Sequence, residues 1–160
     1  MALDLGDVVT RTNRFLVADI EDSLFVTLFL LLLDPRSASF VSVSAGHNAY
    51  LFEPEKHVKV LRSTGLPLGI DDTATFLPTD QVTLEPGQIL VLVTDSISEA
   101  ATAENSLFGM KRLAEVVHGS RKRSASEIVE AVLEASHAFS ATGSRHDDKT
   151  AIVVKRNPIS

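Results

Sequence analysis

Acidic residues at the ends of two apolar stretches are the strongest chemical signal in this sequence. Asp95 closes the apolar run 89–94, and Asp147 and Asp148 immediately precede the run 150–155. If these runs are neighbouring antiparallel strands, the end of one lies beside the start of the other, and Asp95 and Asp147 converge. Carboxylates gathered at one site repel each other unless a cation neutralises them. The spacing therefore suggests a site for a divalent cation.

The type of cation follows from the ligands that the chain offers. The sequence contains no cysteine, and hard oxygen ligands without thiolates favour Mg²⁺ or Mn²⁺. A second interpretation needs no metal: Asp95 caps a helix or turn over residues 96–100, while Asp147 and Asp148 form an Asx-turn on the surface. Spacing alone leaves both interpretations open.

The stretch Gly46-His47-Asn48 is a second place where chemistry is conceivable. Gly46 permits an unusual backbone conformation, and His47 or Asn48 can donate hydrogen bonds to an anionic group. The alternative is a hairpin turn in which Asn48 adopts the left-handed conformation and His47 is exposed. The other histidines with no partner at a useful spacing are predicted to lie on the surface; they are His57, His118 and His137.

The N-terminal half predicts one helix followed by strands. A helix over residues 4–18, with Asp4 as its N-cap, would bury the apolar positions of one face. Residues 24–33 are continuously apolar and predict a strand buried on both faces. Residues 39–45 alternate and predict its hairpin partner. Shorter strands are expected at residues 50–52 and 57–62, and the helical face comprises Leu5, Val8, Val9, Thr12, Phe15 and Leu16.

The C-terminal half predicts the strand at residues 89–94, two helices and a last strand. The helices are expected at residues 108–118 and 126–139, the second with Ser126 as its cap. Consecutive strands with segregated helices predict an α+β fold with antiparallel sheet.

Composition limits the class of protein. The 160 residues suit one domain, and the apolar and charged fractions of 44% and 22% are those of a soluble globular protein. The formal charge of −6 argues against nucleic acid as a partner. The apolar run 24–33 is too short to span a bilayer, no signal peptide is recognisable, and the lack of cysteine fits the cytoplasm. Triad-hydrolase and Walker-type phosphate-binding motifs are absent from the sequence.

Several motifs together resemble those of the SpoIIE/RsbU-type bacterial serine phosphatases, a branch of the metal-dependent type 2C (PPM) protein phosphatases. In chain order they are "FVTLF", "VSAGHNAYLF", "GLPLGI", "LEPGQILVLVTDSISEA", "FG" at residues 108–109 and "HDDKTAIVVKR". The resemblance runs from about residue 5 to residue 156. It implies an α–β–β–α sandwich and a two-metal centre of Mn²⁺ or Mg²⁺ that activates water for attack on phosphoserine or phosphothreonine.

The resemblance also implies roles for individual residues. Asp95 and Asp147 match the family's metal ligands and act in catalysis, and Asp148 matches a further metal-binding position. Gly46 and His47, with the adjoining Asn48, match a segment near the active-site edge and are predicted to contact substrate. The usual substrate in this branch is a phosphorylated anti-sigma-factor antagonist.

This sequence departs from the family pattern in two ways. It lacks a Gly-Asp-x-x-Gly-His-Gly-like stretch near its start, and Ser96 stands where the family has glycine after the metal-binding aspartate. We therefore expect a single domain over residues 1–160 that lacks the N-terminal metal-ligand segment. A non-catalytic regulatory module with the same fold is the alternative. In the family that N-terminal segment is carried by opening strands. Without them the apolar face of residues 24–33 would be uncovered, which predicts self-association of the chain.

Overall fold

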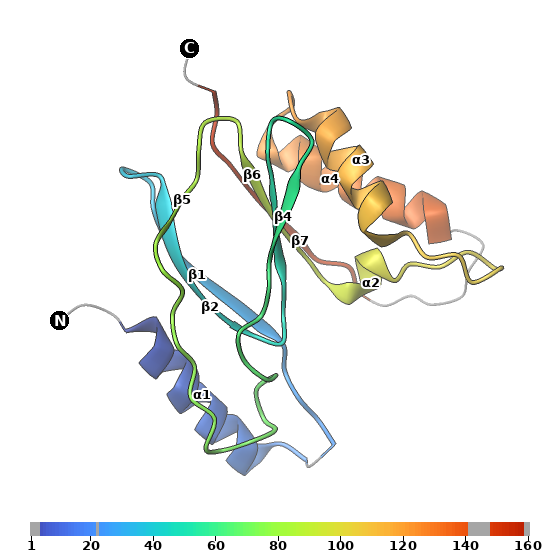
Figure 1. Ribbon diagram of the computed structural model, residues 1–160. Coiled ribbons are helices and arrows are strands. Elements are labelled where there is room, and N and C mark those ends of the chain that lie inside the picture. The colour runs from blue at the N-terminus through green and yellow to red at the C-terminus, as the bar shows by residue number, and fades with distance from the viewer. Residues whose placement is uncertain (1–3, 22, 141–147, 159–160) are drawn as a thin grey trace. The chain divides into compact units, whose positions relative to one another are not determined.

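The computed structural model describes residues 4–21, 23–140 and 148–158, which belong to two compact units (Figure 1). The first unit draws on residues up to 49 and on 60–85, and the second on residues 50–59 and those from 86 onward. Antiparallel sheets accompanied by helices make up the fold. The predicted α+β class is therefore confirmed.

The sheet of the first unit has the strand order β1-β2-β5. Strands β1 (Leu28–Asp34) and β2 (Ser39–Ala45) pair antiparallel over their full length, as the predicted hairpin requires, and β5 (Val82–Thr83) adds to the far side of β2. The prediction of a doubly buried strand at residues 24–33 is wrong. The strand begins later, Phe25 is 60% exposed and Leu32 49% exposed. Helix α1 packs on β2, and β1 is the end strand of the described sheet, so its apolar run is only partly covered.

Helix α1 (Leu5–Asp19) begins where the sequence predicts, because the Asp4 carboxylate accepts a backbone N–H of the first turn at 3.1 Å. Its buried face agrees with the predicted one only in part: Leu5 and Val9 are buried as expected, but other members of that face are not. Phe15 is 68% exposed, whereas the polar residues Thr10 and Asn13 are buried. Both polar side chains hydrogen-bond to the loop that follows β4, and these bonds fix which face of α1 turns inward.

The sheet of the second unit has the order β4-β3-β6-β7. Its strands are β3 (Ala49–Phe52), β4 (Val58–Leu61), β6 (Ile89–Val93) and β7 (Ala151–Lys155). Each lies within one residue of its predicted bounds. Strand β6 pairs antiparallel with β3 on one side and β7 on the other, and almost all of its side chains are buried. It is therefore the central strand of this unit.

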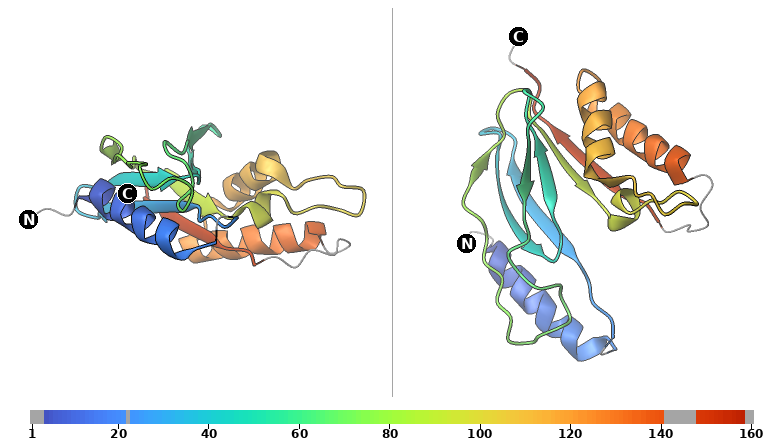
Figure 2. Two further views of the ribbon diagram at one scale, coloured as in Figure 1. Left: turned by 90° about the horizontal axis from the view of Figure 1, so that it is seen from below. Right: turned by 45° about the vertical axis from the view of Figure 1, so that its right-hand side comes forward.

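Three helices accompany this sheet. The short α2 (Asp95–Ser98) follows β6 directly, and α3 (Gly109–Ser120) and α4 (Ala125–Ser140) lie side by side along one face of the sheet (Figure 2). Fully buried side chains from the strands and all three helices form one core, including Phe52, Val91, Ile97, Leu113, Val117, Ile128 and Val132. None of the helices in the described ranges combines the length and hydropathy needed to cross a bilayer.

The N-terminus of α4 is capped by Ser124. The prediction that Ser126 is the cap is therefore wrong. The Ser124 backbone N–H and hydroxyl donate to the Glu127 carboxylate at 2.9 and 2.6 Å, and the Ser124 hydroxyl oxygen accepts the Glu127 N–H at 3.3 Å. This reciprocal arrangement is a capping box. The same hydrogen bonds from Ser124 lower the pKa of Glu127. The Ser-x-x-Glu spacing was present in the sequence and identifies the correct cap.

His118 on α3 is half-buried, contrary to the predicted surface position. Its ring meets the Phe52 ring edge-on, with 5.5 Å between centroids. Burial lowers the pKa of His118, and the positive charges of Arg121 and Lys56 lower it further, while a hydrogen bond to the Lys56 backbone opposes this in part. Arg121 cannot move away easily, because its guanidinium donates to the backbone oxygen of Gly87 at 2.8 Å and to two carbonyls of the β3–β4 turn.

This environment predicts a specific pH dependence of stability. Below about pH 6.5 the unfolded chain protonates His118 while the folded chain does not, so the free energy of unfolding falls as the pH drops toward the folded pKa. Above that range His118 contributes no pH dependence. In urea unfolding between about pH 7 and about pH 5, His118→Gln should therefore lose less stability than the wild type. His137→Gln, which removes an exposed histidine of α4, should follow the wild type, and equal slopes for all three proteins would contradict the prediction.

Candidate metal centre

The register of the second sheet places Asp95 beside the start of β7. The last pair of the β6–β7 ladder is Val93 with Ala151, and beyond it the Thr94 N–H donates to the Thr150 carbonyl at 3.1 Å. In Figure 1, α2 lies at the end of β6 next to the start of β7. The expected antiparallel neighbourhood of these two strands, on which the convergence of acids depended, is therefore confirmed.

The Asp95 carboxylate is exposed and is not used as a helix cap. Asp95 is the first residue of α2, and the N-cap position is taken by Thr94 without a side-chain capping bond. Within the described ranges, no residue donates a hydrogen bond to the Asp95 carboxylate. The interpretation of Asp95 as a cap is therefore wrong, and its oxygens are available to a ligand.

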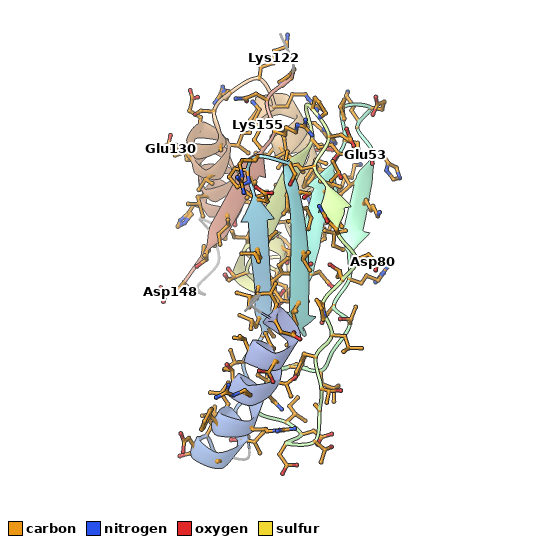
Figure 3. The ribbon with its side chains drawn as sticks, turned by 90° about the vertical axis from the view of Figure 1, so that its left-hand side faces the viewer. Glu53, Asp80, Lys122, Glu130, Asp148 and Lys155 are labelled. Carbon is orange, nitrogen blue, oxygen red and sulfur yellow. The ribbon has the colours of Figure 1, made fainter. Side chains whose placement is uncertain are left out.

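Asp148 is the second described acid at this sheet edge. It is exposed, and Figure 3 shows it at the start of β7, at the opposite end of the strand from Lys155. Asp147, predicted to be the main partner of Asp95, lies outside the described residues. The described part of the proposed ligand set thus consists of the carboxylates of Asp95 and Asp148.

Two hydroxyl groups connect the strand ends that carry these acids. The Ser96 hydroxyl donates to the Asp148 carbonyl at 2.7 Å and lies 2.8 Å from the Thr94 hydroxyl. The Thr94 hydroxyl oxygen accepts the Thr150 N–H at 3.0 Å. Ser96 has no positive φ, so the serine in place of the family's glycine creates no backbone strain here. Sequence reasoning treated Ser96 only as a departure and missed this network.

Lys149 anchors the start of β7 from the other side. Its ammonium donates to the Ser136 carbonyl at 3.2 Å and to the Ser140 hydroxyl at 3.1 Å, in the last turns of α4. Burial lowers the pKa of Lys149. A cation is favourable at the C-terminal end of a helix, where backbone carbonyls point outward. The segment that follows the proposed ligands is therefore tied both to α2 and to α4.

The chemistry of these side chains fits a hard divalent cation. Asp95 and Asp148 offer anionic oxygens that no described donor occupies, at one edge of one rigid sheet. Among the described residues, to which Asp147 does not belong, no group of three or more His, Asp or Glu side chains is suited to a metal. Mg²⁺ keeps several waters and often takes only one or two protein carboxylates, so this donor set is compatible with it.

The stretch Gly46-His47-Asn48 forms a fixed bend in the first unit. Gly46 has φ +72°, and its N–H donates to the Ser63 hydroxyl at 2.7 Å and the Gly65 carbonyl at 3.0 Å. The Asn48 side-chain oxygen accepts the Ser63 N–H at 2.9 Å, and Asn48 does not adopt the left-handed conformation. His47 is half-buried, and its carbonyl accepts a hydrogen bond from a serine of β2. The hydrogen bonds of Gly46 and Asn48 thus hold the bend itself.

Comparison with solved structures identifies the class of fold. The SiaA-PP2C domain of Pseudomonas aeruginosa superimposes with a TM-score of 0.79 at 18% sequence identity, covering 96% of this chain and 60% of that one. The chain therefore has the fold of the PP2C phosphatase domains.

Sequence comparison is more specific. Residues 2–157 match the family described as Stage II sporulation protein E (SpoIIE), and the chain belongs to this family. Phosphoserine phosphatase RsbU of Bacillus subtilis is 28% identical over 153 residues, which is 94% of this chain. Protein IcfG of Synechocystis sp. is 27% identical over the same length. The chain spans 45% of the length of RsbU and 24% of that of IcfG.

Proposed function

We propose that this chain is part of a metal-dependent protein serine/threonine phosphatase. The observation that carries the proposal is the β6–β7 register, which brings the exposed carboxylate of Asp95 to the sheet edge where Asp148 lies. Membership of the SpoIIE family and the similarity to a protein named phosphoserine phosphatase support the same activity.

In this proposal Asp95, Asp147 and Asp148 hold Mn²⁺ or Mg²⁺. When bound, the cation supplies Lewis acidity toward phosphoryl oxygens and lowers the pKa of a water molecule. The protein residues hold the ligand geometry: the β6–β7 ladder fixes the two strand ends, and Lys149 fixes the chain just after Asp148. Gly46, His47 and Asn48 stay predicted substrate contacts.

The proposed substrate is a phosphoserine or phosphothreonine on a regulatory protein such as an anti-sigma-factor antagonist. It rests on the family resemblance and on the similarity to RsbU. The acidic net charge of −6 gives no reason to propose a nucleic-acid partner. Self-association and a cytoplasmic location stay predictions from the sequence.

Metal removal and replacement test the proposal. A phosphoserine-containing antagonist-type protein should be dephosphorylated in the presence of millimolar Mn²⁺ or Mg²⁺, and chelation with EDTA should reduce the rate at least about 100-fold, reversibly. Released phosphate is measured, and addition of the same buffer without EDTA serves as the control. Hydrolysis that survives chelation would contradict the proposed mechanism. Binding of the phosphoprotein without hydrolysis at any metal concentration would favour the non-catalytic regulatory module.

A further inference from the structure

The hydroxyls of Thr94 and Ser96 form a chain of hydrogen bonds between the end of β6 and the residues that precede β7. A carbonyl oxygen can only accept, so the Ser96 hydroxyl must donate to Asp148. Ser96 therefore accepts from the Thr94 hydroxyl, and Thr94 in turn accepts the Thr150 N–H. The Thr94 hydroxyl also has the Thr150 carbonyl as a longer acceptor at 3.5 Å, and among the described residues neither hydroxyl bonds to the carboxylates of the proposed centre.

One end of this chain of bonds is rigid. Ser96 lies in α2 between Asp95 and Ile97, and the Ile97 side chain is completely buried in the core of the second unit. The Glu99 N–H closes the turn onto the Asp95 carbonyl at 2.7 Å. Because α2 is anchored in this way, the Ser96 hydroxyl is a fixed point to which the main chain at Asp148 is attached.

The hydrogen bond from Ser96 to Asp148 lies beyond the end of the regular β6–β7 ladder. The last paired residues of β6 and β7 are Val93 and Ala151, so the backbone at Asp148 lies three residues before the first ladder pair. Thr150 and Lys149 are tied to Thr94 and to α4, and the bond from Ser96 is the one that holds the main chain at Asp148 itself to the Asp95 turn. A glycine at position 96 has no side chain to make that bond.

We propose that Ser96 is a positioning residue of the metal centre: its hydroxyl, oriented by Thr94, holds the main chain of Asp148 at the distance from Asp95 that a shared cation requires. The inference rests on the proposed function, since it assigns a cation to these carboxylates. Ser96 itself contacts neither the cation nor the substrate. Groups of this kind, which orient ligands without binding the metal, typically change metal affinity by about 10-fold to about 100-fold.

The test compares variants of Ser96 with a matched control. Ser96→Ala and Ser96→Gly remove the hydroxyl, while Ser96→Thr keeps it. Ser98→Ala removes a hydroxyl from the same turn that bonds only within α2, to the Asp95 carbonyl at 3.2 Å. For each protein the Mn²⁺ dissociation constant is measured from the electron paramagnetic resonance signal of free Mn²⁺. Amide hydrogen exchange at Lys149 and Thr150 is measured without metal.

We expect Ser96→Ala and Ser96→Gly to raise the Mn²⁺ dissociation constant about tenfold, with Ser96→Thr and Ser98→Ala within about twofold of the wild type. Exchange at Lys149 and Thr150 should quicken in Ser96→Ala and Ser96→Gly alone. Unchanged Mn²⁺ affinity in Ser96→Ala, or an equal loss in Ser98→Ala, would overturn the inference. If the wild-type protein binds no Mn²⁺, the proposed function fails. Unchanged exchange in Ser96→Ala would show that the Ser96 hydroxyl does not hold the main chain of Asp148.

Discussion

Replacing Asp95 with asparagine should lower the metal-dependent phosphatase activity at least about 100-fold, because it removes an anionic ligand while keeping the size of the side chain. The Asp95 carboxylate is exposed and is bonded to no donor among the described residues, so its loss leaves no buried group unsatisfied. The fold should therefore survive the change. The measurements are kcat/KM on a phosphoserine protein at several Mn²⁺ concentrations and the Mn²⁺ dissociation constant.

Glu99→Gln is the matched control for this variant. Glu99 is an exposed acid at the C-cap of α2, four residues from Asp95, and its replacement removes the same charge from the same surface. If activity depends on a ligand and not on local negative charge, Glu99→Gln should keep at least about half of the wild-type rate. Equal activity losses in the two variants, or less than about a tenfold loss in Asp95→Asn, would refute the assignment of Asp95 as a ligand.

The part of the site on β6 and β7 could be predicted because backbone pairing alone determines it. An apolar run that ends in an acid, and a second run that begins after an acid, need only be antiparallel neighbours to bring the acids to one edge. The structure contains this pairing. The roles of Asp95, Asp147 and Asp148 as metal ligands came from the family resemblance, since spacing alone left a capping interpretation open.

The features that escaped prediction depend on tertiary hydrogen bonds. Ser96 was recognised as a departure from the family pattern, but its bond to the Asp148 carbonyl joins residues that are far apart in sequence. The exposure of Phe15 has a similar cause. The orientation of α1 depends on the hydrogen bonds of Thr10 and Asn13 as well as on its apolar pattern. Hydrophobic periodicity locates a helix well, but it cannot identify a polar side chain that is buried together with its hydrogen-bond partners.

The N-cap of α4 was predicted wrongly for a different reason. The Ser-x-x-Glu signature at the start of α4 identifies Ser124, whereas the sequence interpretation placed the cap at Ser126. The extent of β1 was misjudged because a continuous apolar run does not reveal how many neighbours a strand has. Leu32 is the exposed apolar residue within β1, and Leu24, Phe25 and Val26 are exposed just before the strand.

Asn13 gives the largest expected effect on stability in the first unit. Its side-chain N–H donates to the Asp71 carbonyl at 2.7 Å, and its side-chain oxygen accepts the Gly69 N–H at 2.9 Å, while the residue itself is completely buried. Asn13→Ala breaks both bonds: the buried side of the loop loses the acceptor of the Gly69 N–H, while the Asp71 carbonyl keeps only its longer bond from the Ala74 N–H at 3.3 Å. At about 1–1.5 kcal/mol for each lost bond, the free energy of unfolding should fall by about 2–3 kcal/mol.

Asn13→Asp and Arg14→Ala show whether these two bonds are the cause. Aspartate keeps the oxygen that accepts from Gly69 but presents a carboxylate to the Asp71 carbonyl, so at neutral pH it should destabilise at least as much as alanine. Arg14 is the exposed next residue, and its replacement should change the free energy of unfolding by no more than about 0.5 kcal/mol. Urea unfolding measures all three. If Asn13→Ala were no less stable than Arg14→Ala, the loop would not depend on α1 for its backbone partners, and the orientation of α1 would have to come from its apolar contacts instead.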